Sequence, residues 1–338
     1  MAKVAERIQR AYREALEGGE TRVEYWFQHF GLSNDPFGDP FDQAPESWSS
    51  SSRWIVGIDE LAERLAKDVA MSEKGYVGFV PIAGAPGAGR KTLCKVVAWA
   101  LHREAEFREP ADPPEAGKMS FLLGNTFRPI DQRGPKTLEF VIFTNMQYLR
   151  LQQEIRKHLV DEIWVRPRST QEIALTLRLR LESGLGARAD IQQILPEDAI
   201  RELCRYSMGL PGAALQLARE AFVAAFWAKA NEVSAAQVRR TAKQLGFDAA
   251  VRDYPSLSEP ARNVASVLAR ADGPIETSQV VEMYENMFGI ARDRSVVSRH
   301  LNRLETLNLA RRTERGRAAS YEPTPAQVMA VEKEMYPA

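Results

Sequence analysis

A short apolar run that ends on three closely spaced glycines constrains the fold of this chain more than any other feature. The run is YVGFVPIAG (76–84), the glycines are Gly84, Gly87 and Gly89, and a helical pattern follows in KTLCKVVAWALHREAEF (91–107). A strand, a glycine turn and a helix in that order let backbone N–H groups surround a phosphate at the start of the helix. The sequence therefore predicts either a phosphate-binding loop or a glycine turn that only joins a strand tightly to a helix.

The end of this loop departs from the pattern G-x-x-x-x-G-K-[ST]. Arg90 stands where the lysine that reaches the terminal phosphates belongs, Lys91 stands where a hydroxyl would hold Mg²⁺, and Thr92 comes one position late. A one-residue insertion would restore the order and leave an active ATPase. Without that insertion, the loop keeps N–H groups for the phosphates of ATP or ADP but lacks the hydroxyl that binds Mg²⁺.

Composition places the chain among globular proteins. Its 338 residues, 44% of them hydrophobic, can bury a sizeable core and favour two or three domains. Cys94 and Cys204 lie far apart and the four histidines are scattered, so the sequence offers no metal cluster and indicates a reduced, cytoplasmic location. No apolar run approaches the ~20 residues that cross a bilayer, and we expect no membrane partner.

Strand and helix patterns divide the chain into four parts. Predicted capping boxes at Ser169 to Glu172, Ser234 to Gln237 and Ser256 to Glu259 mark three helix starts. Strand-like runs stop near residue 165, helices fill the next part, and three helices followed by the hairpin LARRTERGRAASYEPT (309–324) predict a winged helix. The expected domains are an N-terminal helix (1–24), an α/β nucleotide-binding-like domain (25–165), a helical lid (166–250) and a winged helix (251–338).

Arginine is concentrated in the predicted winged helix, although the whole chain balances 45 basic against 45 acidic residues. Between residues 292 and 317, eight arginines accompany three acidic residues, a balance of +5. The residues left outward by the apolar stripe of the helix, together with the hairpin tip, are of types that contact phosphates and base edges. The predicted duplex-DNA-binding residues are Arg292, Arg294, Ser295, Ser298, Arg299, Asn302, Arg303, Arg315 and Arg317.

Taken together, these motifs resemble the AAA+ branch of the P-loop ATPases, in the domain order of archaeal origin-recognition and replication-initiator proteins. VIFTN (141–145), followed by residues 151–182, is similar to the first sensor strand and its passage into the lid, which places Asn145 at the polar sensor position. GLPGAALQLAREA (209–221) is similar to the second sensor helix, and HFGLSNDPF (29–37) is similar to the opening of secretion-pathway ATPases of the ExeA type. The resemblance implies an α/β fold: an AAA+ P-loop domain with a parallel sheet, a helical lid and a C-terminal winged-helix domain.

Two departures from the family bear on catalysis. No apolar run ending in Asp-Glu, the pair that helps hold Mg²⁺ and polarises water, lies between Thr92 and Val141, and Gly212 stands where the second sensor offers an arginine. Since phosphoryl transfer depends on positioning and charge stabilisation, we expect no ATP hydrolysis, no catalytic residue and no metal ligand. The predicted nucleotide-binding residues are Gly84, Gly87, Gly89, Arg90, Lys91, Thr92 and Asn145.

The leading hypothesis is a DNA-binding, initiator-like AAA+ protein with a degenerate nucleotide site. The resemblance implies a role in DNA replication and origin recognition. Two alternatives remain open: an active ATPase with a shifted loop register, and an interaction adaptor in transposition, secretion or defence whose winged helix docks proteins. Protein partners or self-association are compatible with each hypothesis.

Overall fold

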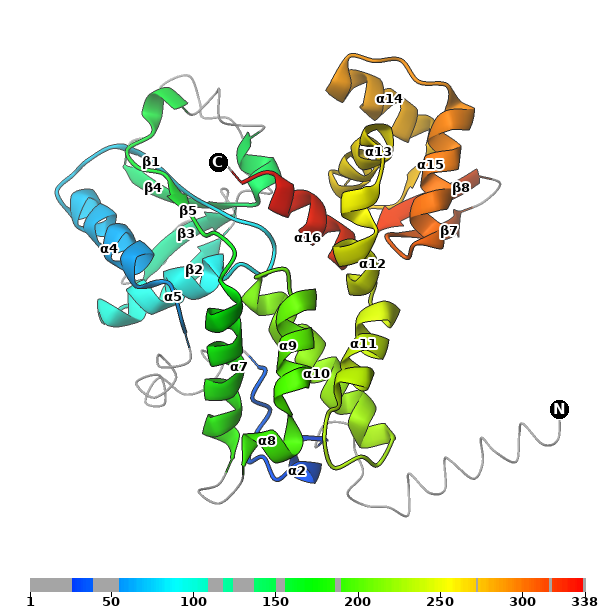
Figure 1. Cartoon of the computed structure of the whole chain (residues 1–338). Coiled ribbons are helices and arrows are strands. Elements are labelled where there is room, and N and C mark those ends of the chain that lie inside the picture. Colours follow the sequence, from blue (N-terminus) through cyan, green and yellow to red (C-terminus); the bar gives the residue numbers. More distant parts are fainter. Residues whose placement is uncertain are drawn as a thin grey trace.

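The computed structural model describes residues 26–38, 55–108, 118–123, 137–149, 156–185, 190–271, 273–315 and 318–336. These residues form an α/β body, a group of lid helices and a winged-helix unit (Figure 1). The expected N-terminal helix (1–24) lies outside the described residues. Among the described helices, none has the length and apolar character needed to span a bilayer.

A five-stranded parallel sheet forms the centre of the α/β body, in the order β2-β3-β4-β1-β5. Every residue of β1 is buried, as expected for a central strand covered on both faces. Parallel pairing places the carboxyl ends of β1, β4 and β5 at the same edge of the sheet. The strands are β1 (Gly78–Ala83), β2 (Ala105–Arg108), β3 (Met119–Leu123), β4 (Leu138–Phe143) and β5 (Ile163–Trp164).

The two faces of the sheet bury different sets of side chains, because neighbouring residues of a strand point to opposite faces. Val80 and Ile82 of β1 belong to the large core, whereas Phe79 and Ala83 belong to a smaller cluster with Tyr148. Helices α4 (Asp59–Glu73) and α5 (Arg90–Ala100) pack against each other, and α4 also contacts β4 and β5.

The lid helices follow β5. The short helix α2, from the N-terminal part of the chain, packs on α10, where the Trp26 ring stacks on Phe37 at 5.9 Å and meets Phe222 at 5.3 Å between centroids. The predicted capping boxes from Ser169 to Glu172 and from Ser234 to Gln237 are both present. The helices are α2 (Trp26–His29), α7 (Thr170–Gly184), α8 (Ile191–Ile194), α9 (Glu197–Tyr206), α10 (Pro211–Trp227), α11 (Ala235–Gln244) and α12 (Phe247–Arg252).

The winged-helix unit joins three helices to a three-stranded antiparallel sheet in the order β6-β8-β7. The helix that follows the wing, α16, runs from this unit back toward the α/β body, as its red ribbon shows in Figure 1. The elements are α13 (Glu259–Ala269), β6 (Ile275–Glu276), α14 (Thr277–Phe288), α15 (Arg294–Thr306), β7 (Ala310–Arg315), β8 (Ala318–Pro323) and α16 (Pro325–Glu334).

Two local predictions were wrong. The helix after the glycine loop ends at Ala100 instead of continuing to residue 107, because the chain turns at His102 (φ 56°) and residues 105–108 pair with β3 as strand β2. The capping box predicted from Ser256 to Glu259 is absent: Ser256 lies in the short 3-10 turn Tyr254–Ser256, and Ser258 occupies the N-cap of α13 without a side-chain bond.

Candidate functional site

The glycine loop connects the carboxyl end of β1 to the N-terminus of α5. Gly87 (φ 80°) and Gly89 (φ 100°) adopt left-handed backbone conformations that favour glycine, and Gly89 is the N-cap of α5. Within the described residues, the N–H groups of Gly89, Arg90 and Lys91 donate to no protein acceptor. Free N–H groups at a helix N-terminus favour an anion, so this loop can hold a phosphate.

The register of α5 decides which side chains can reach that anion. The helix begins directly after Gly89, with Arg90 as its first residue and Lys91 as its second. The Lys91 ammonium lies 5.3 Å from the centroid of the Phe107 ring on β2. The Arg90 side chain lies close to Gly84, at the start of the loop. A Cβ atom added at Gly84 would lie 3.3 Å from Cγ of Arg90. Burial lowers the pKa of Arg90, whereas the nearby Glu332 and Tyr336 raise it.

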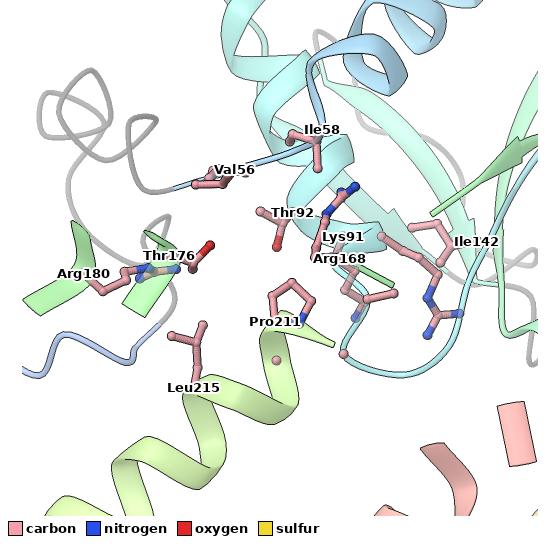
Figure 2. Close-up of a pocket in the computed structure, with 16 residues that line it drawn as sticks. Val56, Ile58, Lys91, Thr92, Ile142, Arg168, Thr176, Arg180, Pro211 and Leu215 are labelled. Atoms are coloured by element: carbon pink, nitrogen blue, oxygen red, sulfur yellow. The ribbon is translucent and has the colours of Figure 1, made fainter. Parts of the chain in front are cut away.

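A cavity of about 310 Å³ lies beside the loop, between the α/β body and the lid. Figure 2 shows Val56 and Ile58 on the segment before α4, Thr92 on α5, Thr176 and Arg180 on α7, and Pro211 and Leu215 on α10. The cavity joins an apolar side to the loop N–H groups, as nucleotide sites require. Of the predicted residues it brings together Gly87, Gly89, Arg90, Lys91 and Thr92.

The lid packs directly on the loop at two glycines. The N–H of Gly212, the second residue of α10, donates to the carbonyl oxygen of Gly87 at 2.8 Å. A Cβ at Gly212 would lie 2.8 Å from the Cα of Gly87, closer than real Cβ atoms approach backbone. The position at which the family offers an arginine to the phosphate therefore has no room for any side chain in this arrangement.

Two arginines that the sequence analysis did not single out supply positive charge to the cavity. Arg168 lies between β5 and α7, and its buried Nε and Nη2 have no hydrogen-bond partner in the described part of the chain. Burial lowers the pKa of Arg168, and Glu172 opposes that shift. Arg180 of α7 donates from Nη1 to the Gly38 carbonyl at 2.9 Å. No motif marks either residue, because they reach the loop only through tertiary packing.

Asn145, the predicted polar sensor, lies at the sheet edge but does not line the cavity. Its side chain is fully buried, and Nδ2 donates to the backbone carbonyl of Glu332 in α16 at 2.9 Å. The N–H of Met146 donates to the Glu332 carboxylate at 3.1 Å. The structure therefore directs the asparagine amide toward α16.

The residues present do not fit a bound Mg²⁺. None of the cavity-lining residues carries a carboxylate, and Lys91 occupies the position of the hydroxyl ligand. Strand β3 ends at Leu123, and the sequence continues with Gly124 and Asn125 in place of an acidic pair. In the described part of the chain, no group of three or more His, Cys, Asp or Glu residues could hold a metal ion.

Of the predicted DNA-binding residues, Arg292 lies just before α15, and Arg294, Ser295, Ser298, Arg299, Asn302 and Arg303 lie on it. Arg294, Ser295, Arg299, Asn302 and Arg303 are exposed, while Arg292 and Ser298 are half-buried. The Arg315 side chain and Arg317 lie outside the described residues.

Between α15 and the sheet lies a hollow of about 400 Å³, lined on the helix by Arg294, Ser298 and Asn302 and on the sheet by Arg312 and Tyr321. The Tyr321 hydroxyl donates to Asn302 Oδ1 at 2.8 Å. This bond fixes the oxygen side of the Asn302 amide, so its Nδ2 points away from Tyr321.

The described residues combine a five-stranded parallel sheet, a glycine loop between β1 and α5, a group of lid helices and a winged-helix unit. The chain is similar to the Aeropyrum pernix ORC1 protein, solved in complex with DNA, at 17% identity and a TM-score of 0.44 over 83% of this chain and 92% of that one. It is also similar to the Thermotoga maritima RuvB Holliday junction branch migration motor, at 16% identity and a TM-score of 0.43 over 79% and 92% of the two chains. No model of a protein family matches the sequence, and no curated protein matches it either.

Proposed function

We propose that this chain is a DNA-binding AAA+ protein that binds ATP or ADP as a conformational ligand and does not hydrolyse it. The observation that carries the nucleotide part is the set of unpartnered donors around one cavity: the loop N–H groups and the Arg168 guanidinium. N–H groups at the start of a helix favour an anion, and the buried Nε and Nη2 of Arg168 lack a partner among the described residues, so the two together favour an acceptor-rich, anionic ligand.

The binding mode follows from the two sides of the cavity. The N–H groups at the start of α5 hold the phosphates, and Arg90 and Arg168 balance their charge. Val56, Ile58 and Leu215 offer an apolar surface to the base. Because Gly212 is bonded to Gly87, the lid covers the loop and limits access of water.

Hydrolysis is not part of the proposal, because phosphoryl transfer depends on metal ions and a group that positions the attacking water. The cavity lining holds no carboxylate for either task. An active ATPase with a shifted loop register remains the second candidate for this site, and it requires the Lys91 ammonium to leave the Phe107 ring.

The nucleotide proposal is tested by thermal denaturation and calorimetry of the full chain with ADP and ATP. Saturating nucleotide raises the melting temperature by mass action, and Arg168→Ala weakens binding by about tenfold or more, since hydrogen bonds to charged groups contribute roughly 1.5–3 kcal/mol. Arg201→Ala, at an exposed position on α9, is the control and leaves the affinity unchanged. Absence of a shift at millimolar nucleotide would contradict the proposal, and turnover that disappears in Lys91→Ala would establish the shifted register.

The DNA part of the proposal is supported by the exposed arginines of α15. Arg299 and Arg303 are one helical turn apart and exposed. Arg294 and Arg312 line the neighbouring hollow, together with Glu276. A helix with this surface next to a wing matches the geometry by which helix-turn-helix proteins enter a major groove while contacting the backbone.

The full chain is expected to retard duplex DNA at low salt, and the double variant Arg299→Ala, Arg303→Ala is expected to lose most of that binding. Arg201→Ala is the control, an exposed arginine on α9 far from the wing in sequence. If wild type fails to retard duplex DNA, the winged helix is a protein-docking module and the adaptor hypothesis takes first place.

A further inference from the structure

Helix α16 connects the winged-helix unit to the edge of the sheet that carries the phosphate loop. At its start, the Gln327 amide donates to the Ala265 carbonyl of α13 at 2.9 Å, which fixes the helix to the winged-helix unit. Further along, Glu334 accepts a hydrogen bond from the Tyr254 hydroxyl at 3.1 Å. Helix α16 is therefore bonded to α13 near its start and to the turn before α13 at its last residue.

The far end of α16 contacts three strand ends of the α/β body. The Tyr336 hydroxyl accepts from the N–H of Ala85, in the phosphate loop, at 2.7 Å and donates to the Val165 carbonyl, just after β5, at 2.9 Å. Glu332 binds the segment after β4 through Asn145 and Met146. These bonds join the first residues after β1, β4 and β5 to the C-terminal end of one helix.

The same contacts place Glu332 near Arg90, which also lines the cavity beside the loop. Glu332 is only 2% exposed, and burial raises the pKa of its carboxyl. Hydrogen bonds from the Thr144 hydroxyl and the Met146 N–H act in the opposite direction and lower this pKa. A carboxylate near Arg90 competes with phosphate for the same positive charge.

We propose that Glu332 and Tyr336 form a latch that holds the winged helix against the phosphate-loop edge of the sheet, and that a third phosphate at the loop releases it. A diphosphate fits the loop with the latch closed. A triphosphate brings further negative charge toward Arg90 and draws its guanidinium away from Glu332. The latch itself stands on the contacts described, whereas its release rests on the proposed nucleotide binding.

The latch is tested without ligand by the distance between spin labels in the full chain. Labels at Glu63→Cys on α4 and Glu285→Cys on α14 use exposed positions, while the native Cys94 and Cys204 are buried. We expect one narrow distance distribution that broadens in Tyr336→Phe, which removes both hydroxyl bonds. Tyr206→Phe is the matched control, because it removes a hydroxyl bond to Asp248 within the lid region. An unchanged distribution in Tyr336→Phe would overturn the latch.

Release is tested in the same labelled protein with ADP and a non-hydrolysable ATP analogue. The analogue is expected to broaden the distribution and ADP to leave it narrow, and Glu332→Gln is expected to reduce the affinity difference between the two ligands because it removes the competing charge. If calorimetry detects binding of the analogue but the distribution stays narrow, release is wrong. If neither nucleotide binds, the proposed nucleotide function fails, while the result for Tyr336→Phe still decides the latch.

Discussion

Asp68 is the residue whose environment departs most from what its sequence position indicates. It lies on α4 with only 3% of its surface exposed, and its Oδ2 has no hydrogen-bond partner among the described residues. Burial raises the pKa of Asp68 to about 6, with a further contribution from the Asp161 charge and an opposing one from Arg64. Helical spacing gives no sign of this, because Asp161 comes from the segment before β5.

A pH dependence of stability follows from this raised pKa. In the unfolded chain the carboxyl titrates near 3.8, so between about pH 4 and 6 the folded protein holds a proton that the unfolded chain has released. The stabilisation is complete below pH 4 and is lost as the pH rises through 6. Asp68→Asn is therefore expected to raise stability at pH 7.5 by about 1–3 kcal/mol and to flatten this part of the profile.

Urea denaturation of both proteins from pH 4 to 8 provides the measurement. Glu63→Gln, an exposed position on the same helix, is the control and should follow wild type. A profile for Asp68→Asn that parallels wild type throughout would contradict a raised pKa at this residue.

At the scale of elements, the contact between α10 and the phosphate loop is the feature that most restricts substitution. Gly212→Ala places a Cβ against the Gly87 backbone, so either the lid or the loop must move. Overpacking of this kind costs about 1–3 kcal/mol. We expect Gly212→Ala to lower the melting temperature and Gly212→Arg to open the lid instead of restoring a sensor arginine.

Thermal denaturation and limited proteolysis of the lid would check this expectation. Gly273→Ala is the matched control, because a Cβ there meets no atom within 4 Å. If Gly212→Arg were as stable as wild type and bound nucleotide more tightly, the close approach of the two glycines would not describe the protein in solution.

At the scale of the whole molecule, charge is neutral in total, and the segment from residue 292 to residue 317 carries a local excess of basic residues, with eight arginines and three acidic residues. Because 45 basic residues balance 45 acidic ones, the body of the protein contributes little non-specific attraction to DNA. The salt dependence of DNA binding should therefore come from the winged helix, at about 0.9 in the slope of log K against log salt for each phosphate that it neutralises.

The predicted outcome is a reduction of roughly 1 in that slope for Arg299→Ala and for Arg303→Ala, if each arginine binds one phosphate. Fluorescence anisotropy with labelled duplex DNA at several salt concentrations would measure it, with Arg201→Ala as the control. A slope unchanged in both variants would assign the phosphate contacts to other residues.

Local sequence patterns were sufficient for the elements and for the loop. The glycines at 87 and 89 predicted the turn because their positive φ favours that residue, and two of three capping boxes were confirmed because their bonds lie within four residues. The four-residue strand β2 was missed. Its sequence AEFR is too short to show the alternation of apolar and polar residues that marks a strand, and its pairing with β3 is not local.

The sequence by itself determined that this chain forms an α/β body with a glycine loop between a strand and a helix, followed by further helices and an arginine-rich winged-helix unit, because those features depend on residues close together in the chain. Tertiary structure decided the rest of the site. Arg168, the contact of Gly212 with Gly87, and the approach of Glu332 and Tyr336 to the loop each join residues far apart in sequence. No periodicity or motif encodes such contacts, since they depend on how whole helices pack across the carboxyl edge of the sheet.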